Sequence, residues 1–324
     1  MLKLGLAVLT GLVLGAGAAA HAAPVNVLVS PAVVGEDNYP KLKAAFPKGV
    51  TGLPNLTYAV HPGYQPLKLD VYLPARPAKG KETPKPLVLY VHGGGWVGGT
   101  SRSAGAFADF PGTLAELASR GYVVASVNYR LSGEARFPAA IDDVRDAVIW
   151  LKGHAKEYGI DTRRTAIWGG SAGGQLAGLA AVECPTAATG KPDACVQSAV
   201  IWYGVFDFAS MPRREAPGGS ENAYLGCKLS DCPDVVAAAS PIAHVDAKDP
   251  PTLLIFGSDD KTVPPDQSRA MAARLKAAGV QVQVMELPGL DHSFIGKTPA
   301  DTKSGSLKAI QATFDFFDAT VGRK

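Results

Sequence analysis

The feature that most constrains this chain is a serine in a glycine-rich turn between a predicted strand and a predicted helix. Residues 168–174 read Trp-Gly-Gly-Ser-Ala-Gly-Gly; an apolar strand at 165–168 precedes the turn, and a helix of small residues at 172–182 follows it. A serine on so sharp a turn is held in strained backbone geometry, and the flanking glycines let the chain fold back closely. The pattern predicts that Ser171 stands above a sheet as a nucleophile. An incidental serine in a glycine-rich turn fits these flanking elements less well.

Strands and helices alternate along most of the chain. Nearly continuous apolar runs predict strands that are buried on both faces, and alternating apolar residues predict half-buried strands. Apolar residues at helical spacing predict helices between the strands. The predicted strands lie at residues 56–60, 67–73, 87–91, 123–127, 199–203, 252–256 and 280–287, and the predicted helices begin at Pro138 or lie near 267–278 and 304–320. This order is typical of an α/β protein with a mostly parallel, doubly wound sheet.

The sequence is predicted to have three parts. Residues 1–22 are predicted to be a signal peptide, because Lys3 precedes an apolar run and residues 20–22 have the small-x-small pattern of a cleavage site. A membrane anchor is the alternative, but the run is shorter than the ~20 residues that a bilayer span needs. Residues 23–55 are predicted to form an N-terminal arm, and residues 56–324 a catalytic domain. An insertion at about 206–246 should form a cap over the carboxyl ends of the strands.

Composition and charge indicate an ordinary globular protein. Hydrophobic residues make up 47% of the chain and charged residues 19%. Removal of Lys3 with the signal peptide would change 32 basic residues against 29 acidic residues to 31 against 29, a net charge of +2. Nothing in this balance indicates a nucleic-acid partner, and no stable membrane span is expected in the mature chain. The predicted location is the periplasm or the extracellular medium.

Export changes the interpretation of the four cysteines, Cys184, Cys195, Cys227 and Cys232. An oxidising compartment allows them to form disulfides, and they lie in two pairs that are local in sequence. We expect Cys184 to pair with Cys195 and Cys227 with Cys232, although three pairings are possible. The spacing does not match a tetrahedral zinc set, so no metal site is expected.

A second glycine-rich segment follows the predicted strand at 87–91. Residues 92–96 read His-Gly-Gly-Gly-Trp. In acyl transfer the substrate carbonyl becomes an oxyanion, and backbone N–H groups must already point to the place where that charge develops. We expect Gly94, Gly95 and Ala172 to supply these N–H donors, the last because it follows the nucleophile. A phosphate-binding loop fits less well, because the Walker lysine and the dinucleotide spacing are absent.

A nucleophilic serine needs a base, and the base needs an acid to orient it. Of the six histidines, His292 lies in a loop after the predicted strand at 280–287 and follows the serine in chain order, as this type of site requires. The acid should come from the loop after the strand at 252–256, which contains Asp259 and Asp260. Adjacent side chains point in different directions, so only one can serve His292. We choose Asp260 and expect Asp259 to be a turn residue.

Several segments together resemble bacterial α/β-hydrolase esterases. They are residues 92–96, 128–131, 169–174, 239–241 and 257–264, and the similarity covers roughly residues 67–317. Within that superfamily the chain resembles the feruloyl and acetyl xylan esterase branch, which is related to the hormone-sensitive-lipase-like esterases. The lipase-like group usually has an acidic residue where Gly170 stands and a different acid loop. The resemblance implies the α/β-hydrolase fold and the roles assigned above to Ser171, Asp260, His292 and the loop at 92–96.

These residues predict a serine carboxylesterase that cleaves short-chain or aromatic esters through an acyl-enzyme, with a small-molecule or polysaccharide-linked substrate such as a feruloyl or acetyl ester. No metal or organic cofactor is required. The residues expected to line the substrate pocket are Trp96, Tyr203, Phe206, Met211 and Tyr224. The alternatives are an amidase or formamidase with the same triad, a lipid hydrolase, and a non-catalytic exported binding protein with a hydrolase fold.

Overall fold

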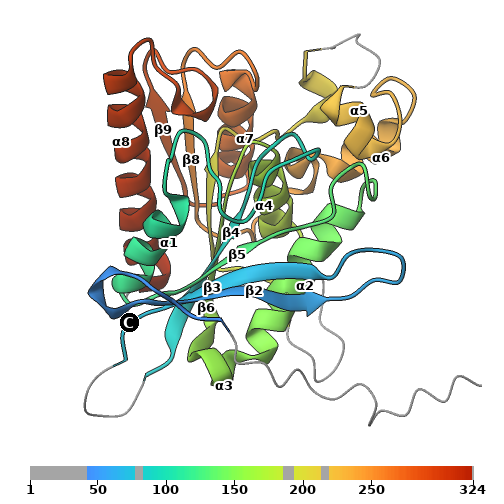
Figure 1. Ribbon diagram of the computed structural model, residues 1–324. Helices are drawn as coiled ribbons and strands as arrows, with labels where there is room; N and C mark the ends of the chain where they lie inside the picture. Colours follow the sequence, from blue (N-terminus) through green and yellow to red (C-terminus); the bar gives the residue numbers. More distant parts are fainter. Residues whose placement is uncertain (1–41, 77–82, 185–192, 213–218, 323–324) are drawn as a thin grey trace, which may run out of the picture. The chain divides into compact units, whose positions relative to one another are not determined.

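Nine strands form one sheet at the centre of the protein, in the order β1-β2-β3-β5-β4-β6-β7-β8-β9. The computed structural model describes residues 42–76, 83–184, 193–212 and 219–322 (Figure 1). The predicted signal peptide and most of the predicted N-terminal arm lie outside these residues. The strands are β1 Ala44–Ala45, β2 Thr51–Ala59, β3 Leu67–Leu73, β4 Lys85–Val91, β5 Val123–Val127, β6 Ile160–Gly170, β7 Ser198–Trp202, β8 Thr252–Gly257 and β9 Val282–Leu287.

The sheet has an antiparallel part and a parallel part. Strands β1, β2 and β3 pair in antiparallel fashion, and β3 pairs antiparallel with β5. From β5 onward every pair is parallel: β5 with β4, then β6, β7, β8 and β9. The predicted mostly parallel α/β-hydrolase sheet is therefore confirmed, and all six parallel strands end at the same edge.

Helices cover both faces of the parallel strands. The helices of the described chain are α1 Phe110–Ser119, α2 Ala139–Gly153, α3 Ala155–Tyr158, α4 Ala172–Val182, α5 Ser220–Leu225, α6 Pro233–Ala239, α7 Pro265–Ala277 and α8 Pro299–Phe317. Alternate residues of β4 face opposite layers: Leu87 and Leu89 pack in the core with α2 and α4, whereas Val88 packs with α1 and α8. Within the described residues, no helix combines the length and apolarity that a membrane crossing requires.

Several predicted boundaries differ from the structure. Residues 51–55, assigned to the N-terminal arm, lie in β2, because the strand begins at Thr51 rather than at residue 56. Helix α8 begins at Pro299 rather than near 304, because the Thr298 side chain accepts from the Asp301 N–H and Asp301 bonds back to the Thr298 N–H, which caps the helix five residues earlier. Helix α1 was not predicted, although Asp109 accepts from the Gly112 N–H as its N-cap.

The insertion at 206–246 contains short helical segments between β7 and β8. They are the 3-10 helices Phe208–Ser210 and Pro241–His244 together with α5 and α6, which lie beside each other in Figure 1. Ser240 joins the two ends of this segment, since its Oγ accepts from the Phe208 N–H at 3.0 Å. The segment packs on the loop after β4 through Tyr224, whose ring stacks on Trp96 with centroids 4.7 Å apart.

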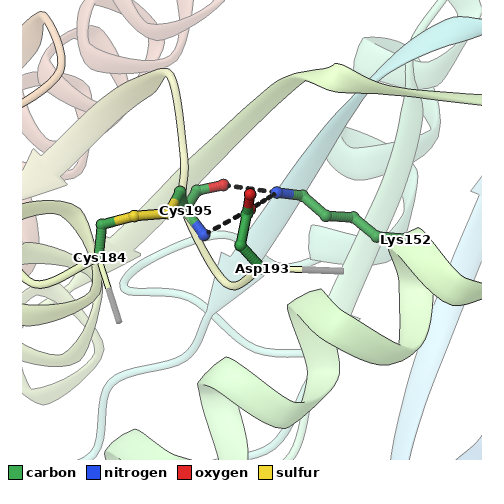
Figure 2. The surroundings of a disulfide bond; sticks show 4 residues. All are labelled: Lys152, Cys184, Asp193 and Cys195. Carbon is green, nitrogen blue, oxygen red and sulfur yellow. Dashed lines mark hydrogen bonds and ion pairs between the residues drawn. A yellow bond between two sulfur atoms is a disulfide. The ribbon is translucent and has the colours of Figure 1, made fainter. Parts of the chain in front are cut away.

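Both expected disulfides are present. Cys184 is bonded to Cys195, and Cys227 to Cys232, with Cα atoms 4.8 and 6.3 Å apart. Figure 2 shows that the first disulfide lies beside Lys152 of α2, whose Nζ donates to Asp193 Oδ1 at 2.6 Å and to the Cys195 carbonyl at 2.8 Å. The Lys152 side chain is 4% exposed, so these two bonds supply acceptors for an ammonium group that is almost out of solvent. The disulfide and the lysine thus hold the segment before β7 against α2.

Replacing both Cys184 and Cys195 by serine should lower the free energy of unfolding by about 3 kcal/mol, because the crosslink restricts a loop of about 11 residues in the unfolded chain. The same change at Cys227 and Cys232 removes a crosslink that closes a shorter loop, and it should cost about 2 kcal/mol. Urea unfolding without reductant measures both losses. An unfolding midpoint equal to that of the parent protein for the Cys184 and Cys195 variant would contradict a stabilising crosslink.

Replacing Lys152 by methionine should destabilise the protein by roughly 1–2 kcal/mol at neutral pH, because the Cys195 carbonyl loses the Lys152 donor and the Asp193 carboxylate loses one of its two donors, keeping the Cys195 N–H. The hydrogen bond from Lys152 holds the pKa of Asp193 below its usual value. A depressed carboxyl pKa contributes stability above the unfolded pKa of about 4, and this contribution is lost as the pH falls through the lower folded value. Urea unfolding from pH 7 to pH 3 should therefore show the parent and the variant converging. A pH-independent difference would exclude the Asp193 contribution, and Asp193→Asn is the matched control.

Candidate active site

Ser171 lies on a tight turn between the end of β6 and the start of α4. Its backbone has φ 57° and ψ −124°, a conformation that non-glycine residues rarely adopt. The Ser171 N–H donates to the Trp202 carbonyl of β7 at 3.0 Å, and the Ser171 carbonyl accepts from the Gln175 N–H at 3.0 Å. A side chain at Gly173 would approach the Val91 carbonyl oxygen to 2.2 Å, so only glycine lets α4 start this close to β4. These contacts hold the strained turn.

The structure brings the three predicted triad residues together from loops far apart in sequence. His292 Nε2 is 2.9 Å from Ser171 Oγ, and His292 Nδ1 is 2.8 Å from Asp260 Oδ2. The His292 side chain is 18% exposed, and that of Asp260 is fully buried. Because Asp260 Oδ2 accepts a hydrogen bond from His292 Nδ1–H, the arrangement favours the tautomer in which His292 Nε2 can take a proton from the serine.

The acid loop after β8 holds its two aspartates in different environments. Asp260 Oδ1 accepts from the backbone N–H groups of Thr262 and Val263 at 2.9 and 2.8 Å, which leaves Oδ2 for His292. Asp259 Oδ1 instead accepts from the Ser258 hydroxyl at 2.7 Å. The geometry thus agrees with the choice of Asp260 as the partner of His292.

Asp291 is a supporting residue that the sequence analysis did not single out. Its Oδ1 accepts from the Lys261 N–H at 2.9 Å and from the His292 N–H at 2.7 Å. The hydrogen bond from the Lys261 N–H, followed by that from His292, holds the pKa of Asp291 below its usual value. Asp291 therefore ties the acid loop to the histidine loop. In the sequence, only its position directly before His292 indicated a role for Asp291 near the base.

The loop at 92–96 lies beside Ser171. Gly94 and Gly95 have φ of 117° and 61°, and both line the cavity that contains Ser171. Among the described residues, the N–H groups of Gly94, Gly95 and Ala172 donate no hydrogen bond to another part of the chain. Ala172 is also the first residue of α4, where helical N–H groups lack partners and carry partial positive charge. These three N–H groups can therefore serve as donors to a substrate.

His92 is a structural part of this loop. Its Nδ1 is 2.7 Å from the Gly93 carbonyl, and its ring stacks on Tyr129 with centroids 4.4 Å apart. Burial lowers the pKa of His92 to about 4, so the imidazole is neutral at physiological pH and its Nδ1–H donates to the carbonyl. The Tyr129 hydroxyl donates to the His92 carbonyl at 2.9 Å. The loop is thus fixed without adding charge beside the serine.

Gln175 is a second supporting residue that the sequence analysis did not identify. It is the only residue of α4 with a polar side chain, and it is fully buried. Its Oε1 accepts from Trp96 Nε1 at 3.0 Å, and its Nε2 donates to the Ala239 carbonyl at 2.8 Å. The amide therefore connects the nucleophile helix, the loop at 92–96 and the insertion. The signal in the sequence was an amide in an otherwise apolar helix.

A cavity of about 430 Å³ opens over Ser171 and His292. Of the predicted pocket residues, Trp96 and Tyr203 line it. Phe206, Met211 and Tyr224 are not among the described residues that line it, which corrects the prediction. Phe206 packs instead with Leu254 and Met271 between β8 and α7, and Met211 and Tyr224 are buried in the main core.

The walls of the cavity are formed largely by glycines, by residues with hydroxyl side chains and by Glu221. The full set is Tyr90, Gly93, Gly94, Gly95, Trp96, Gly99, Ser103, Ala104, Gly105, Gly170, Ser171, Tyr203, Val205, Ser220, Glu221, Thr262, Val263, His292 and Ser293.

Comparisons with known proteins show which proteins this chain is similar to. The sequence profile of the BD-FAE family matches residues 69–275. Esterase LipQ of Mycobacterium tuberculosis is 32% identical over 271 residues, which cover 81% of this chain and 62% of LipQ. Ethyl acetate hydrolase of Pseudomonas putida is 32% identical over 238 residues, which cover 69% of this chain and 71% of that protein. A solved carbohydrate esterase from gut microbiota, a truncated form, superposes with a TM-score of 0.67 at 28% identity, over 84% of this chain and 96% of that one.

The aligned part of this chain spans 49–62% of the length of the curated relatives LipQ, LipC and LipM. The family profile nevertheless covers more than half of the 324 residues, and the sheet order and the matched solved structure agree with it. The chain therefore belongs to the BD-FAE family of α/β-hydrolases.

Proposed function

We propose that this protein is a serine carboxylesterase in which Ser171 is the nucleophile, His292 the general base and Asp260 the residue that orients the base. The observation that supports this most directly is the continuous hydrogen-bonded series from Ser171 Oγ through His292 to Asp260 Oδ2, at 2.9 and 2.8 Å. Beside it lie three backbone N–H groups that have no acceptor among the described residues. The names of the relatives, which include esterases and carboxylic ester hydrolases, agree with this activity.

In the first half of the proposed reaction, Ser171 Oγ attacks the ester carbonyl carbon while its proton moves to His292 Nε2. The carbonyl oxygen becomes negatively charged and accepts hydrogen bonds from the N–H groups of Gly94, Gly95 and Ala172. Asp260 stabilises the imidazolium that forms. The proton on Nε2 then passes to the alkoxide oxygen, the ester C–O bond breaks, and the alcohol leaves the acyl-enzyme.

In the second half, a water molecule takes the place of the departed alcohol. His292 Nε2 accepts a proton from this water as its oxygen attacks the acyl carbonyl, and the same backbone donors stabilise the second oxyanion. Collapse of this intermediate returns the proton to Ser171 Oγ and releases the carboxylic acid. Every proton transfer in the cycle uses the one imidazole, so no further acid or base is required.

We propose esters with short acyl groups and hydroxyl-bearing alcohols as substrates, including acetyl or feruloyl esters of polysaccharide. The cavity has modest volume, and hydroxyl groups from Ser103, Ser220, Thr262 and Ser293 lie along its walls. Such groups can donate to and accept from the hydroxyls of a sugar. The matched solved structure is described as a carbohydrate esterase, which agrees with this substrate class. The two disulfides agree with the proposal that the protein is exported to the periplasm or the medium.

Replacing Ser171 by alanine should lower kcat/KM for p-nitrophenyl acetate by at least about 10⁴-fold, because the nucleophile is lost. Asp260→Asn should cost roughly 10³-fold or more, since the imidazole loses its orienting charge. Asp259→Asn is the matched control and should retain activity within about two-fold, because Asp259 contacts Ser258 instead. Equal activity of the parent and the Ser171→Ala variant would contradict the proposal.

A series of p-nitrophenyl esters from acetate to palmitate, with methyl ferulate alongside, defines the acyl preference, and a matched anilide tests amide cleavage.

Replacing Glu221 by glutamine should change charge selectivity at the cavity. Glu221 lies in the first turn of α5, and its Oε2 accepts from the Ser220 hydroxyl at 3.1 Å. A cationic alcohol group bound near this carboxylate would gain ~1 kcal/mol, a several-fold effect. The ratio of kcat/KM for acetylcholine to that for the uncharged isostere 3,3-dimethylbutyl acetate should therefore fall about three- to ten-fold in the variant. An unchanged ratio would show that Glu221 does not contribute to substrate selection.

A further inference from the structure

The proposed oxyanion donors come from two separate elements. The N–H group of Ala172 begins α4, whereas those of Gly94 and Gly95 belong to the loop after β4. A developing oxyanion is stabilised best when all of its donors already point to the place where the charge forms. The placement of this loop relative to the start of α4 therefore decides how well the site stabilises the transition state.

The loop after β4 has an unusual backbone conformation where these donors lie. Gly94, Gly95 and Trp96 are consecutive residues with positive φ, of 117°, 61° and 59°. Glycine adopts such angles readily, but a residue with a side chain does so only where its surroundings hold it. Contacts of Trp96 with the rest of the protein are therefore needed to keep the loop in this conformation.

Three kinds of contact hold Trp96. Its carbonyl accepts from the Ser132 N–H at 2.8 Å and from the Ser132 hydroxyl at 3.0 Å. Its indole ring is buried and stacks on Tyr224 of α5, with an angle of 7° between the ring planes. Its indole N–H donates to Gln175 Oε1 at 3.0 Å. Of these contacts, only the last joins the loop to the nucleophile helix α4.

Gln175 lies three residues after Ala172 on α4. Residues at this spacing are almost one turn apart on the same side of a helix, so their relative positions are fixed by the helix itself. The Gln175 N–H donates to the Ser171 carbonyl at 3.0 Å, which closes the first turn of α4. The hydrogen bond from Trp96 therefore couples the two elements that supply the oxyanion donors.

The amide of Gln175 has a defined orientation. Its Nε2 donates to the carbonyl of Ala239, the last residue of α6, at 2.8 Å, while its Oε1 accepts from Trp96. The side chain is fully buried. Rotating the amide by 180° would place Nε2 against the indole N–H and Oε1 against the carbonyl, and would leave all four groups unpaired. The insertion thus fixes the amide in the orientation that accepts from Trp96.

We propose that Gln175 is a positioning residue for the oxyanion donors: through the indole of Trp96 it keeps the loop at 92–96 aligned with the start of α4. The inference rests on the proposed esterase function and deepens it. Gln175 is not among the described residues that line the cavity, so its side chain acts on the reaction through Trp96. The benefit falls on the transition state, because the charge that the donors stabilise is absent from the bound ester.

The test replaces Gln175 by methionine, which has a similar length but leaves the Trp96 N–H without its acceptor. We expect kcat/KM for p-nitrophenyl acetate to fall about ten-fold, less than the roughly 10²-fold that loss of a whole donor costs. For the corresponding thionoester, in which sulfur replaces the carbonyl oxygen, the fall should stay within about two-fold. Sulfur is a weak hydrogen-bond acceptor and depends less on the backbone donors. A general loss of folded protein would lower both rates equally.

Trp96→Phe removes the same hydrogen bond from its other side and keeps an aromatic ring against Tyr224. It should show the same selective loss on the oxygen ester, and the double variant should lose little more than either single variant. Thr313→Val is the matched control. It takes the acceptor from another buried indole N–H, that of Trp202, at 3.0 Å, so it should lower stability while leaving the ratio of the two rates unchanged.

Equal losses on the ester and the thionoester in both single variants would overturn the positioning role, as would fully additive losses in the double variant. Trp96→Phe decides the matter if Gln175→Met fails to fold. These results would leave the esterase function intact, provided that the parent protein cleaves p-nitrophenyl acetate and Ser171→Ala does not. Equal activity of those two proteins would instead contradict the function on which the inference rests.

Discussion

The structure depends on the backbone turn that exposes Ser171 at the end of β6. The residue is held at φ 57° because its N–H bonds to β7 and because α4 begins in close contact with β4 at Gly173. This geometry directs the hydroxyl towards the edge of the sheet where the parallel strands end. The histidine loop and the acid loop reach the same edge from β9 and β8, so three residues separated by up to 121 positions meet within hydrogen-bonding distance.

The residues around the triad hold the loops on which its members lie. Asp291 joins the acid and histidine loops, Gln175 joins α4 to Trp96 and the insertion, and Tyr203 contacts the turn after His292. His92 is kept neutral by burial beside the nucleophile. A base that must accept and return a proton in each half-reaction needs a fixed geometry, and these contacts supply it from four different elements.

The sequence predicted the triad geometry better than the pocket. Ser171, His292 and the choice of Asp260 followed from short local patterns and chain order, and the strands at 67–73 and 123–127 from their apolar residues. The pocket walls did not follow, because apolar residues after β7 serve either the core or the cavity according to how the chain turns at Tyr203. Phe206 therefore packs under α7 while Val205 lines the cavity. Gln175 and Asp291 act through contacts across the fold that no local pattern encodes.

The most direct test of the central claim is covalent labelling of the purified protein with an alkyl fluorophosphonate, followed by peptide mapping by mass spectrometry. The account predicts one adduct per chain, on Ser171, because within the described part of the chain only this hydroxyl has an aligned base and an adjacent set of backbone donors. Labelling should be lost in Ser171→Ala and strongly slowed in His292→Ala. An adduct on another residue, or equal labelling of the parent and Ser171→Ala, would contradict the assignment of Ser171 as the nucleophile.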